Sequence, residues 1–249
     1  MTEEKINPTI VTEEAKKTLA SSIKDPMTYE PGMDQLPSTM LEDVERLMKE
    51  FEEQTYSASD VKAALRKDVL SPHDFGALLS PAARPYLEAM AQKAKAVRDR
   101  YFGNSVALFT PLYLANYCEN YCIYCGFNCH NKIHRARLDL AQMEEEMKAI
   151  AATGLEEILM LTGESSHMSP VSYIGEACKM ARRYFRVVGL EIYPVNQKDY
   201  EYLHQCGCDF VTVFQETYDH DLYGKLHLAG NKRVFPYLSL IHISEPTRR

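Results

Sequence analysis

The sequence predicts an α/β fold of the (β/α) barrel type, in which a helical region precedes repeated strand–helix units. Two observations support this prediction. Beyond Gly103, short apolar segments alternate with segments of helical periodicity at intervals of about 30 residues, which is typical of parallel strands joined by helices. Polar residues gather directly after each predicted strand, where the loops of a β/α barrel form its active site.

The first part of the chain divides into a polar leader and a helical region. Residues 1–37 are polar and contain four prolines, so we expect a mobile leader with one short helix near residues 12–22. Residues 38–102 show helical spacing of apolar side chains. Ser71 and Ser80 each precede a proline, and this pair is expected to begin a helix. The longest predicted helix covers residues 82–100.

Four strands and three helices are predicted within residues 103–237. The strands cover residues 106–114, 157–161, 188–193 and 210–214, and the helices cover residues 140–153, 170–185 and 197–205. Gly154 and Gly207 follow two of these helices, as expected where a helix ends in a left-handed residue. Because the carboxyl ends of parallel strands meet at one edge, we expect the residues after the four strands to share one site.

Composition and charge argue against several classes of function. The net charge is −7 and no block of Lys and Arg stands out, which argues against nucleic acid as a partner. No segment approaches the roughly 20 apolar residues of a membrane span, and the N-terminus lacks the apolar stretch of a signal peptide. We therefore expect a cytoplasmic protein without a membrane partner. Seven cysteines in such a protein indicate metal binding rather than disulfides.

Three cysteines directly after the first predicted strand form the strongest functional signal. Cys118, Cys122 and Cys125 lie in the segment NYCENYCIYCGF with the spacing C-x3-C-x2-C. This spacing suits three thiolates at three corners of a [4Fe–4S] cube, which leaves one iron open to a small molecule. Zinc is the alternative, because Cys129 or His130 could supply a fourth ligand, although their spacing does not make a second zinc knuckle.

The cysteine spacing, with an aromatic residue before the last cysteine, resembles the signature of the radical S-adenosylmethionine (SAM) superfamily. Three longer segments are similar to the tyrosine lyases of that superfamily, above all to the 2-iminoacetate synthases of thiamine thiazole synthesis. They are FGNSVALFTPLYLANYCENYCIYCGF (102–127), LTGESSH (161–167) and VFQETYDHDLYGKLH (213–227). The resemblance extends over residues 57–237 and implies a barrel of the radical SAM type.

The resemblance also implies roles for particular residues, although it identifies no catalytic residue. The implied ligands of the [4Fe–4S] cluster are Cys118, Cys122 and Cys125. The residues implied to bind SAM are Gly163, Glu164, Glu191 and Gln215. The residues implied to line the substrate pocket are Tyr113, Glu216 and Tyr218. A carboxylate such as that of Glu164 is suited to the ammonium group of SAM.

The reaction implied by the resemblance is cleavage of the Cα–Cβ bond of L-tyrosine, which yields 2-iminoacetate (dehydroglycine) and 4-methylphenol. One electron from the cluster splits SAM, and the resulting 5′-deoxyadenosyl radical takes a hydrogen atom from the substrate. An electron donor of the flavodoxin or ferredoxin type and a thiazole synthase are the implied partners. The alternatives are the tyrosine lyase of [FeFe]-hydrogenase maturation, which makes CO and cyanide, and a non-catalytic zinc-stabilised module.

The end of the sequence departs from this family. A complete barrel has eight strands in about 250 residues, whereas only the first four βα units are predicted here. Residues 238–248 read LSLIHISEPTR, which is identified as the translation of a transposase adapter used in DNA library preparation. We therefore expect residues 238–249 to be an artefact and the gene to be cut near Tyr237. Since an open sheet edge favours aggregation, we expect this chain alone to fold poorly and to be inactive.

Overall fold

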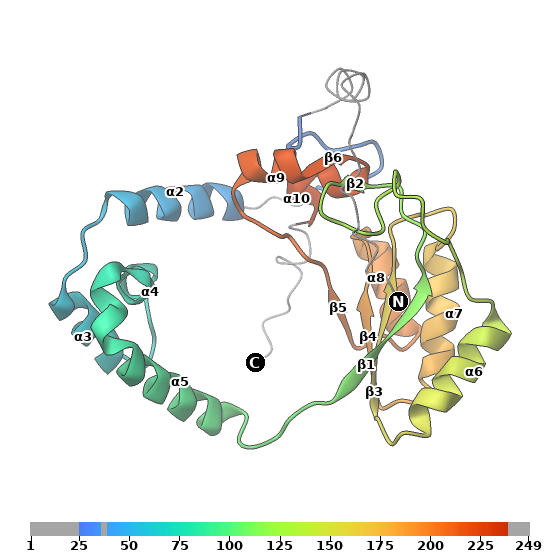
Figure 1. Ribbon diagram of the computed structural model, residues 1–249, viewed down its shortest axis with the longest axis horizontal. Helices are drawn as coiled ribbons and strands as arrows, with labels where there is room; N and C mark the ends of the chain where they lie inside the picture. Colours follow the sequence, from blue (N-terminus) through green and yellow to red (C-terminus); the bar gives the residue numbers. More distant parts are fainter. Residues whose placement is uncertain (1–24, 36–38, 239–249) are drawn as a thin grey trace, which may run out of the picture. The chain divides into compact units, whose positions relative to one another are not determined.

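A computed structural model describes residues 25–35 and 39–238, which fall into two compact units. Residues 39–107 form a helical unit, and residues 25–35 and 108–238 form a unit built around a parallel sheet. The elements of both units are labelled in Figure 1. Within the described ranges, no helix has the length and apolar character needed to cross a membrane.

The helical unit contains four α-helices and one 3-10 helix in the described residues. They are α2 (Met40–Glu53), α3 (Ala58–Arg66), α4 (Pro72–Leu79), η1 (Pro81–Tyr86) and α5 (Leu87–Tyr101). Val61, Ala77 and Ala83 form its small core. The single helix predicted over residues 82–100 is divided into η1 and α5. Pro85 lies inside η1, and because proline has no N–H to donate, it does not continue an α-helix.

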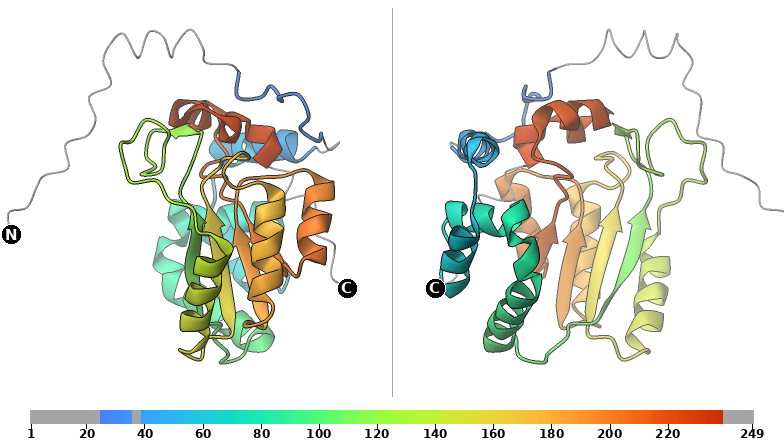
Figure 2. Two further views of the ribbon diagram at one scale, coloured as in Figure 1. Left: turned by 90° about the vertical axis from the view of Figure 1, so that its right-hand side faces the viewer. Right: turned by 60° about the vertical axis from the view of Figure 1, so that its left-hand side comes forward.

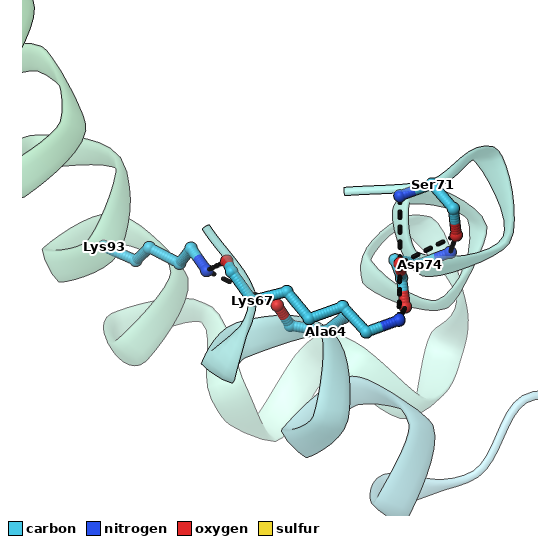
Figure 3. Close-up of polar contacts among 5 residues, drawn as sticks. All are labelled: Ala64, Lys67, Ser71, Asp74 and Lys93. Carbon is cyan, nitrogen blue, oxygen red and sulfur yellow. Dashed lines mark hydrogen bonds and ion pairs between the residues drawn. The ribbon is translucent and has the colours of Figure 1, made fainter. Parts of the chain in front are cut away.

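Two lysines and a helix cap fasten the turn between α3 and α4, as Figure 3 shows. Ser71 begins α4, as predicted, and its hydroxyl accepts a 3.2 Å hydrogen bond from the N–H of Asp74. The Asp74 carboxylate accepts a 2.9 Å hydrogen bond from the N–H of Ser71 and a 2.6 Å hydrogen bond from Lys67 Nζ. Lys93 Nζ donates to the carbonyls of Leu65, at 2.9 Å, and of Lys67.

The sheet unit has the predicted α/β architecture. Its four parallel strands are β1 (Phe109–Ala115), β3 (Glu157–Thr162), β4 (Val187–Glu191) and β5 (Phe210–Thr212), in the order β1-β3-β4-β5. The helices α6 (Leu140–Ala151), α7 (Val171–Ala181) and α8 (Gln197–Gln205) cover one face of this sheet (Figure 2). This arrangement confirms the predicted fold class, a parallel sheet made of successive βα units.

The core of the sheet unit lies between β1, β3 and β4 and the covering helices. Ile158, Met160 and Leu190 are completely buried there and pack with Met143 of α6 and Ile174 of α7. Apolar runs in the strands are explained by this position, since central strands of a covered parallel sheet have little contact with water.

Two predicted strands are longer than the observed ones at their carboxyl ends, and two helices end shortly before a glycine. β4 ends at Glu191 and β5 at Thr212, so the residues that follow are free to turn away from the sheet. Gly154 has a φ of 87° after α6, and Gly207 has a φ of 103° after α8. The glycines follow the two helix ends as predicted; α8 ends at the predicted residue, and α6 ends two residues earlier than predicted.

A second, two-stranded sheet joins distant segments and has no counterpart in the sequence-based prediction. β2 (Tyr121–Cys122) pairs antiparallel with β6 (His227–Ala229). The helix α9 (His220–Leu226) precedes β6, and η2 (Asn231–Arg233) and α10 (Phe235–Leu238) follow it. The cysteine segment is therefore tied to residues that follow β5.

Residues 25–35 belong to the segment predicted to be a leader, and the structure places them against the sheet unit. Arg233 Nη1 donates a 2.9 Å hydrogen bond to the carbonyl of Asp25, and the N–H of Phe235 donates to the carbonyl of Pro26 at 2.9 Å. The helix predicted near residues 12–22 and residues 239–249 of the predicted artefact tail lie outside the described residues.

Candidate active site

A cavity of about 270 Å³ opens at the carboxyl ends of the four parallel strands. Each strand end contributes side chains to its wall, and the cysteine segment after β1 forms one side. Lys232, beyond β6, is the single cationic side chain among the lining residues. The loops at this edge therefore form one shared cavity, in the position where β/α folds hold their active sites.

Cys118, Cys122 and Cys125 all line this cavity and are free thiols. Burial raises the pKa of the Cys118 thiol and raises the pKa of Cys122 to about 12. Backbone N–H groups of Asn120 and Glu164 hydrogen-bond to Cys118 and partly offset the effect of burial. A bound metal ion lowers the pKa of these thiols instead, because a thiol that coordinates a metal loses its proton.

Asn120 ties the cysteine segment to two other parts of the site. It is 3% exposed, and its Nδ2 donates a 2.6 Å hydrogen bond to Glu164 Oε2. Its Oδ1 accepts a 3.1 Å hydrogen bond from the N–H of Lys232, and its carbonyl accepts from the N–H of Cys129 at 2.9 Å. Because a buried amide is costly unless it is hydrogen-bonded, these contacts hold the segment in one position.

Three carboxylates and one ammonium group give the cavity its charge. Glu164, Glu191 and Glu216 line it, and Lys232 Nζ contacts Glu216 Oε1 at 2.8 Å. Burial raises the pKa of Glu164 to about 7, although the Asn120 hydrogen bond lowers it. Burial also raises the pKa of Glu191. Burial acts to raise the pKa of Glu216 too, but the hydrogen bond and charge of Lys232 outweigh it and leave that pKa lowered.

Tyr124, the aromatic residue directly before Cys125, is held in place by a hydrogen bond with His227. The Tyr124 hydroxyl and His227 Nε2 are 2.7 Å apart. His227 Nδ1 lies 2.9 Å from the carbonyl of Tyr223, and a carbonyl only accepts, so Nδ1 carries the proton and Nε2 accepts from Tyr124. Burial lowers the pKa of His227, which agrees with this neutral form of the ring.

The structure brings together most of the residues that the sequence indicated. Those that line the cavity are Tyr113, Cys118, Cys122, Cys125, Gly163, Glu164, Glu191 and Glu216. Gln215 and Tyr218 do not line it. Gln215 is buried, and its Nε2 donates a 3.1 Å hydrogen bond to the carbonyl of Phe235, while Tyr218 is 40% exposed. Cys129, the possible fourth zinc ligand, is exposed and outside the lining.

Several contributors to the site escaped the sequence-based prediction. Asn120 and Tyr124 lie inside the cysteine motif and were not assigned these contacts, whereas Lys232 and His227 follow β5 by many residues. Thr162 ends β3 at the cavity wall, and its hydroxyl is buried without a hydrogen-bond partner among the described residues. An unsatisfied buried hydroxyl at a cavity wall is expected where a ligand supplies the missing partner.

The family model of the radical SAM superfamily matches residues 112–237, which make up half of the chain. The chain belongs to the radical SAM superfamily. This finding confirms the predicted superfamily. The matched region contains the cysteine segment and all four parallel strands apart from the first residues of β1.

Curated relatives narrow the comparison within this superfamily. The 2-iminoacetate synthases of Salmonella typhimurium and Escherichia coli are each 41% identical over 179 residues, which are 72% of this chain and 48% of theirs. The 3-methylornithine synthase of Methanosarcina acetivorans is 34% identical over 64% of this chain and 46% of its own. The chain thus spans about half the length of the curated relatives that it matches.

Solved structures show the same fold. A crystal structure of HydG, a maturase of the [FeFe]-hydrogenase, superposes with a TM-score of 0.74 at 23% identity, over 83% of this chain and 48% of that one. The methylornithine synthase PylB gives a TM-score of 0.52 at 26% identity, over 78% of this chain and 55% of that one. At 23% identity, the similarity to HydG shows only a shared fold.

A [4Fe–4S] cluster and SAM are the cofactors of this superfamily, and the residues present fit both. Three free thiols face one cavity, as a cluster with one open iron requires. Glu164 and Glu191 present carboxylates to the same cavity, which suits the ammonium and sulfonium groups of SAM. The chain therefore has a [4Fe–4S] cluster and SAM as its cofactors.

Proposed function

We propose that this chain is part of a radical SAM lyase that cleaves the Cα–Cβ bond of L-tyrosine to give 2-iminoacetate and 4-methylphenol for thiamine thiazole synthesis. The observation that supports this proposal most directly is the 41% identity with two 2-iminoacetate synthases. The [FeFe]-hydrogenase maturase HydG has the same fold but is only 23% identical to this chain over the superposed region, so the hydrogenase alternative has weaker support from the sequence.

In this proposal the cysteine segment holds the cluster beside the strand ends. Cys118, Cys122 and Cys125 are its ligands. When bound, the cluster and SAM supply one-electron cleavage chemistry that removes a hydrogen atom from the substrate. The chain contributes the surrounding cavity, which is lined by Tyr113 and the cysteine segment.

Acidic side chains at the ends of β3 and β4 orient SAM. Glu164 and Glu191 receive its positively charged groups, and Gly163 lets the backbone at Tyr117 and Cys118 pack closely against the end of β3. Glu216, which is already paired with Lys232, lines the substrate side. Roles for Gln215 in SAM binding and for Tyr218 in the substrate pocket stay predictions based on the family resemblance.

The partners of the reaction are also part of the proposal. They are L-tyrosine as the substrate, an electron donor of the flavodoxin or ferredoxin type, and a thiazole synthase that receives the product. A cytoplasmic location and the absence of nucleic-acid partners complete the prediction.

Anaerobic reconstitution of the 249-residue chain with iron and sulfide tests the cluster. We expect a brown protein with about four irons per chain. The variants Cys118→Ala, Cys122→Ala and Cys125→Ala should lose the iron, and Cys129→Ala should keep it. A colourless protein with one zinc would support the binding-module alternative.

A chimera with a relative tests the reaction. In the 2-iminoacetate synthase of Salmonella typhimurium, the segment that matches this chain is replaced by the corresponding residues of this chain. With SAM, L-tyrosine and a reductant, the cluster-loaded chimera should release 4-methylphenol. A loaded chimera that cleaves SAM without tyrosine-dependent 4-methylphenol would contradict the proposed reaction.

A further inference from the structure

The guanidinium group of Arg135 donates hydrogen bonds to four backbone carbonyls of the cysteine segment. Nη1 contacts the carbonyl oxygens of Asn116 at 2.6 Å and Phe127 at 2.9 Å. Nη2 contacts those of Asn128 at 2.7 Å and Asn131 at 3.5 Å. The planar fork of arginine can satisfy several acceptors at once in a fixed geometry, which a lysine cannot do.

These carbonyls lie at the two ends of the stretch that contains the three cavity thiols. Asn116 precedes Cys118 by two residues, and Phe127 follows Cys125 by two residues. Irregular backbone lacks the regular partners of a helix or sheet, so its carbonyls need other donors. Arg135 therefore closes the cysteine segment into a loop by linking its beginning to its end.

The position of Arg135 is itself determined by its neighbours in the chain. The Asn116 side chain donates to the carbonyl of His134 at 2.8 Å and accepts from the N–H of Ala136 at 2.7 Å. The N–H of Asn116 donates to the carbonyl of Ala136 at 3.1 Å. The segment on both sides of Arg135 is thus paired with the base of the loop, and this pairing aims the guanidinium at the loop interior.

The charge of Arg135 has no carboxylate partner among the ion pairs of the described residues. Arg137, two residues further on, has a different environment, because its guanidinium lies 3.8 Å from the ring centre of Tyr173. An uncompensated cation beside a cluster favours its more negative, reduced form, since net charge is one of the factors that set cluster potentials.

We infer that Arg135 is a positioning residue for the iron–sulfur site: it holds both ends of the cysteine loop together so that Cys118, Cys122 and Cys125 face the cavity. The inference rests on the proposed ligation of the cluster by these three cysteines. Two properties of the side chain contribute separately. The planar guanidinium group fixes the conformation of the loop through its hydrogen bonds, and the positive charge raises the reduction potential of the bound cluster.

Two variants separate the fork from the charge, and a third is the matched control. Arg135→Lys keeps the charge but loses the fork, and Arg135→Gln loses both. Arg137→Gln removes an arginine charge from the same segment without touching the loop carbonyls. In the full chain without iron, hydrogen exchange at the N–H groups of Asn128, Cys129 and Asn131 should be at least tenfold faster in both Arg135 variants than in the wild type and in Arg137→Gln.

After anaerobic reconstitution, both Arg135 variants should retain less than half of the wild-type iron. The residual cluster should have a lower reduction potential in Arg135→Gln, and a potential near that of the wild type in Arg135→Lys. Unchanged exchange rates together with full iron content in Arg135→Gln would overturn the inference. If the wild-type chain itself takes up no cluster, the cysteine assignment fails instead, and the exchange rates still decide the role of Arg135 in the loop.

Discussion

Gly163 and Tyr117 approach so closely that a Cβ atom on Gly163 would overlap the carbonyl oxygen of Tyr117 and lie 2.9 Å from its carbonyl carbon. It would also lie 3.2 Å from Cβ of Cys118. The end of β3 and the first turn of the cysteine segment are therefore in direct backbone contact. Only glycine permits this contact without a shift of the main chain.

Gly163→Ala should consequently displace the cysteine segment and destabilise the sheet unit. Insertion of a methyl group into a packed position costs about 1–3 kcal/mol, which urea denaturation would measure, and iron uptake should fall in parallel. Gly126→Ala is the matched control, because a Cβ at that glycine of the same segment meets nothing within 4 Å. Equal stability of the two variants would contradict the close contact.

Glu164→Gln should weaken SAM binding to the reconstituted chain. The carboxylate lines the cavity beside Cys118, and a hydrogen bond to a charged group is worth about 1.5–3 kcal/mol, which corresponds to a loss of affinity of roughly 10- to 100-fold. Equilibrium dialysis with labelled SAM would measure the difference. Glu156→Gln, at the opposite end of β3, removes an exposed partner of Arg186 and should leave SAM affinity unchanged.

Tyr124→Phe should destabilise the pairing of β2 with β6. The substitution leaves Nε2 of His227, a residue that is 1% exposed, without its hydrogen-bond donor. An unsatisfied buried polar group costs about 1–3 kcal/mol, which chemical denaturation followed by circular dichroism would detect. Tyr113→Phe removes a hydroxyl from a half-exposed ring in the same cavity, so a similar loss in that variant would argue against the role of His227.

The helical unit should lose stability in acid through Asp74. The hydrogen bond from Lys67 and those from Ser71 hold the pKa of Asp74 far below its usual range. A carboxyl group with a lowered pKa in the folded state stabilises the fold fully above its unfolded pKa of about 4 and progressively less as the pH falls below that value.

Urea midpoints at pH 7 and pH 3 would measure this effect. The difference between the two midpoints should be smaller in Asp74→Asn than in the wild type, because the amide does not titrate. Asp68→Asn changes an exposed carboxylate of the same segment and should keep the wild-type difference. A wild-type difference retained in Asp74→Asn would show that other groups are responsible.

Predictions from the sequence succeeded where the signal is local and periodic. The apolar segment Glu157–Leu161 predicted a buried strand, and the structure has β3 there. The glycines at positions 154 and 207 predicted helix ends, and both follow a helix in the left-handed conformation. The helix over residues 197–205 agrees in both bounds. Gln215 shows the limit, since a motif position alone did not reveal that its side chain turns to the Phe235 carbonyl.

The sequence by itself determined the superfamily, the strand–helix order and the three thiols, because each depends on residue types at short and regular spacing. Only the tertiary structure decided which other side chains meet those thiols. Lys232 and His227 lie more than a hundred residues beyond Asn120 and Tyr124, their respective partners, in contacts made through β6 and the turn after it. Irregular loops have no periodic pattern, so their partners depend on which segments the folded sheet brings within hydrogen-bond distance.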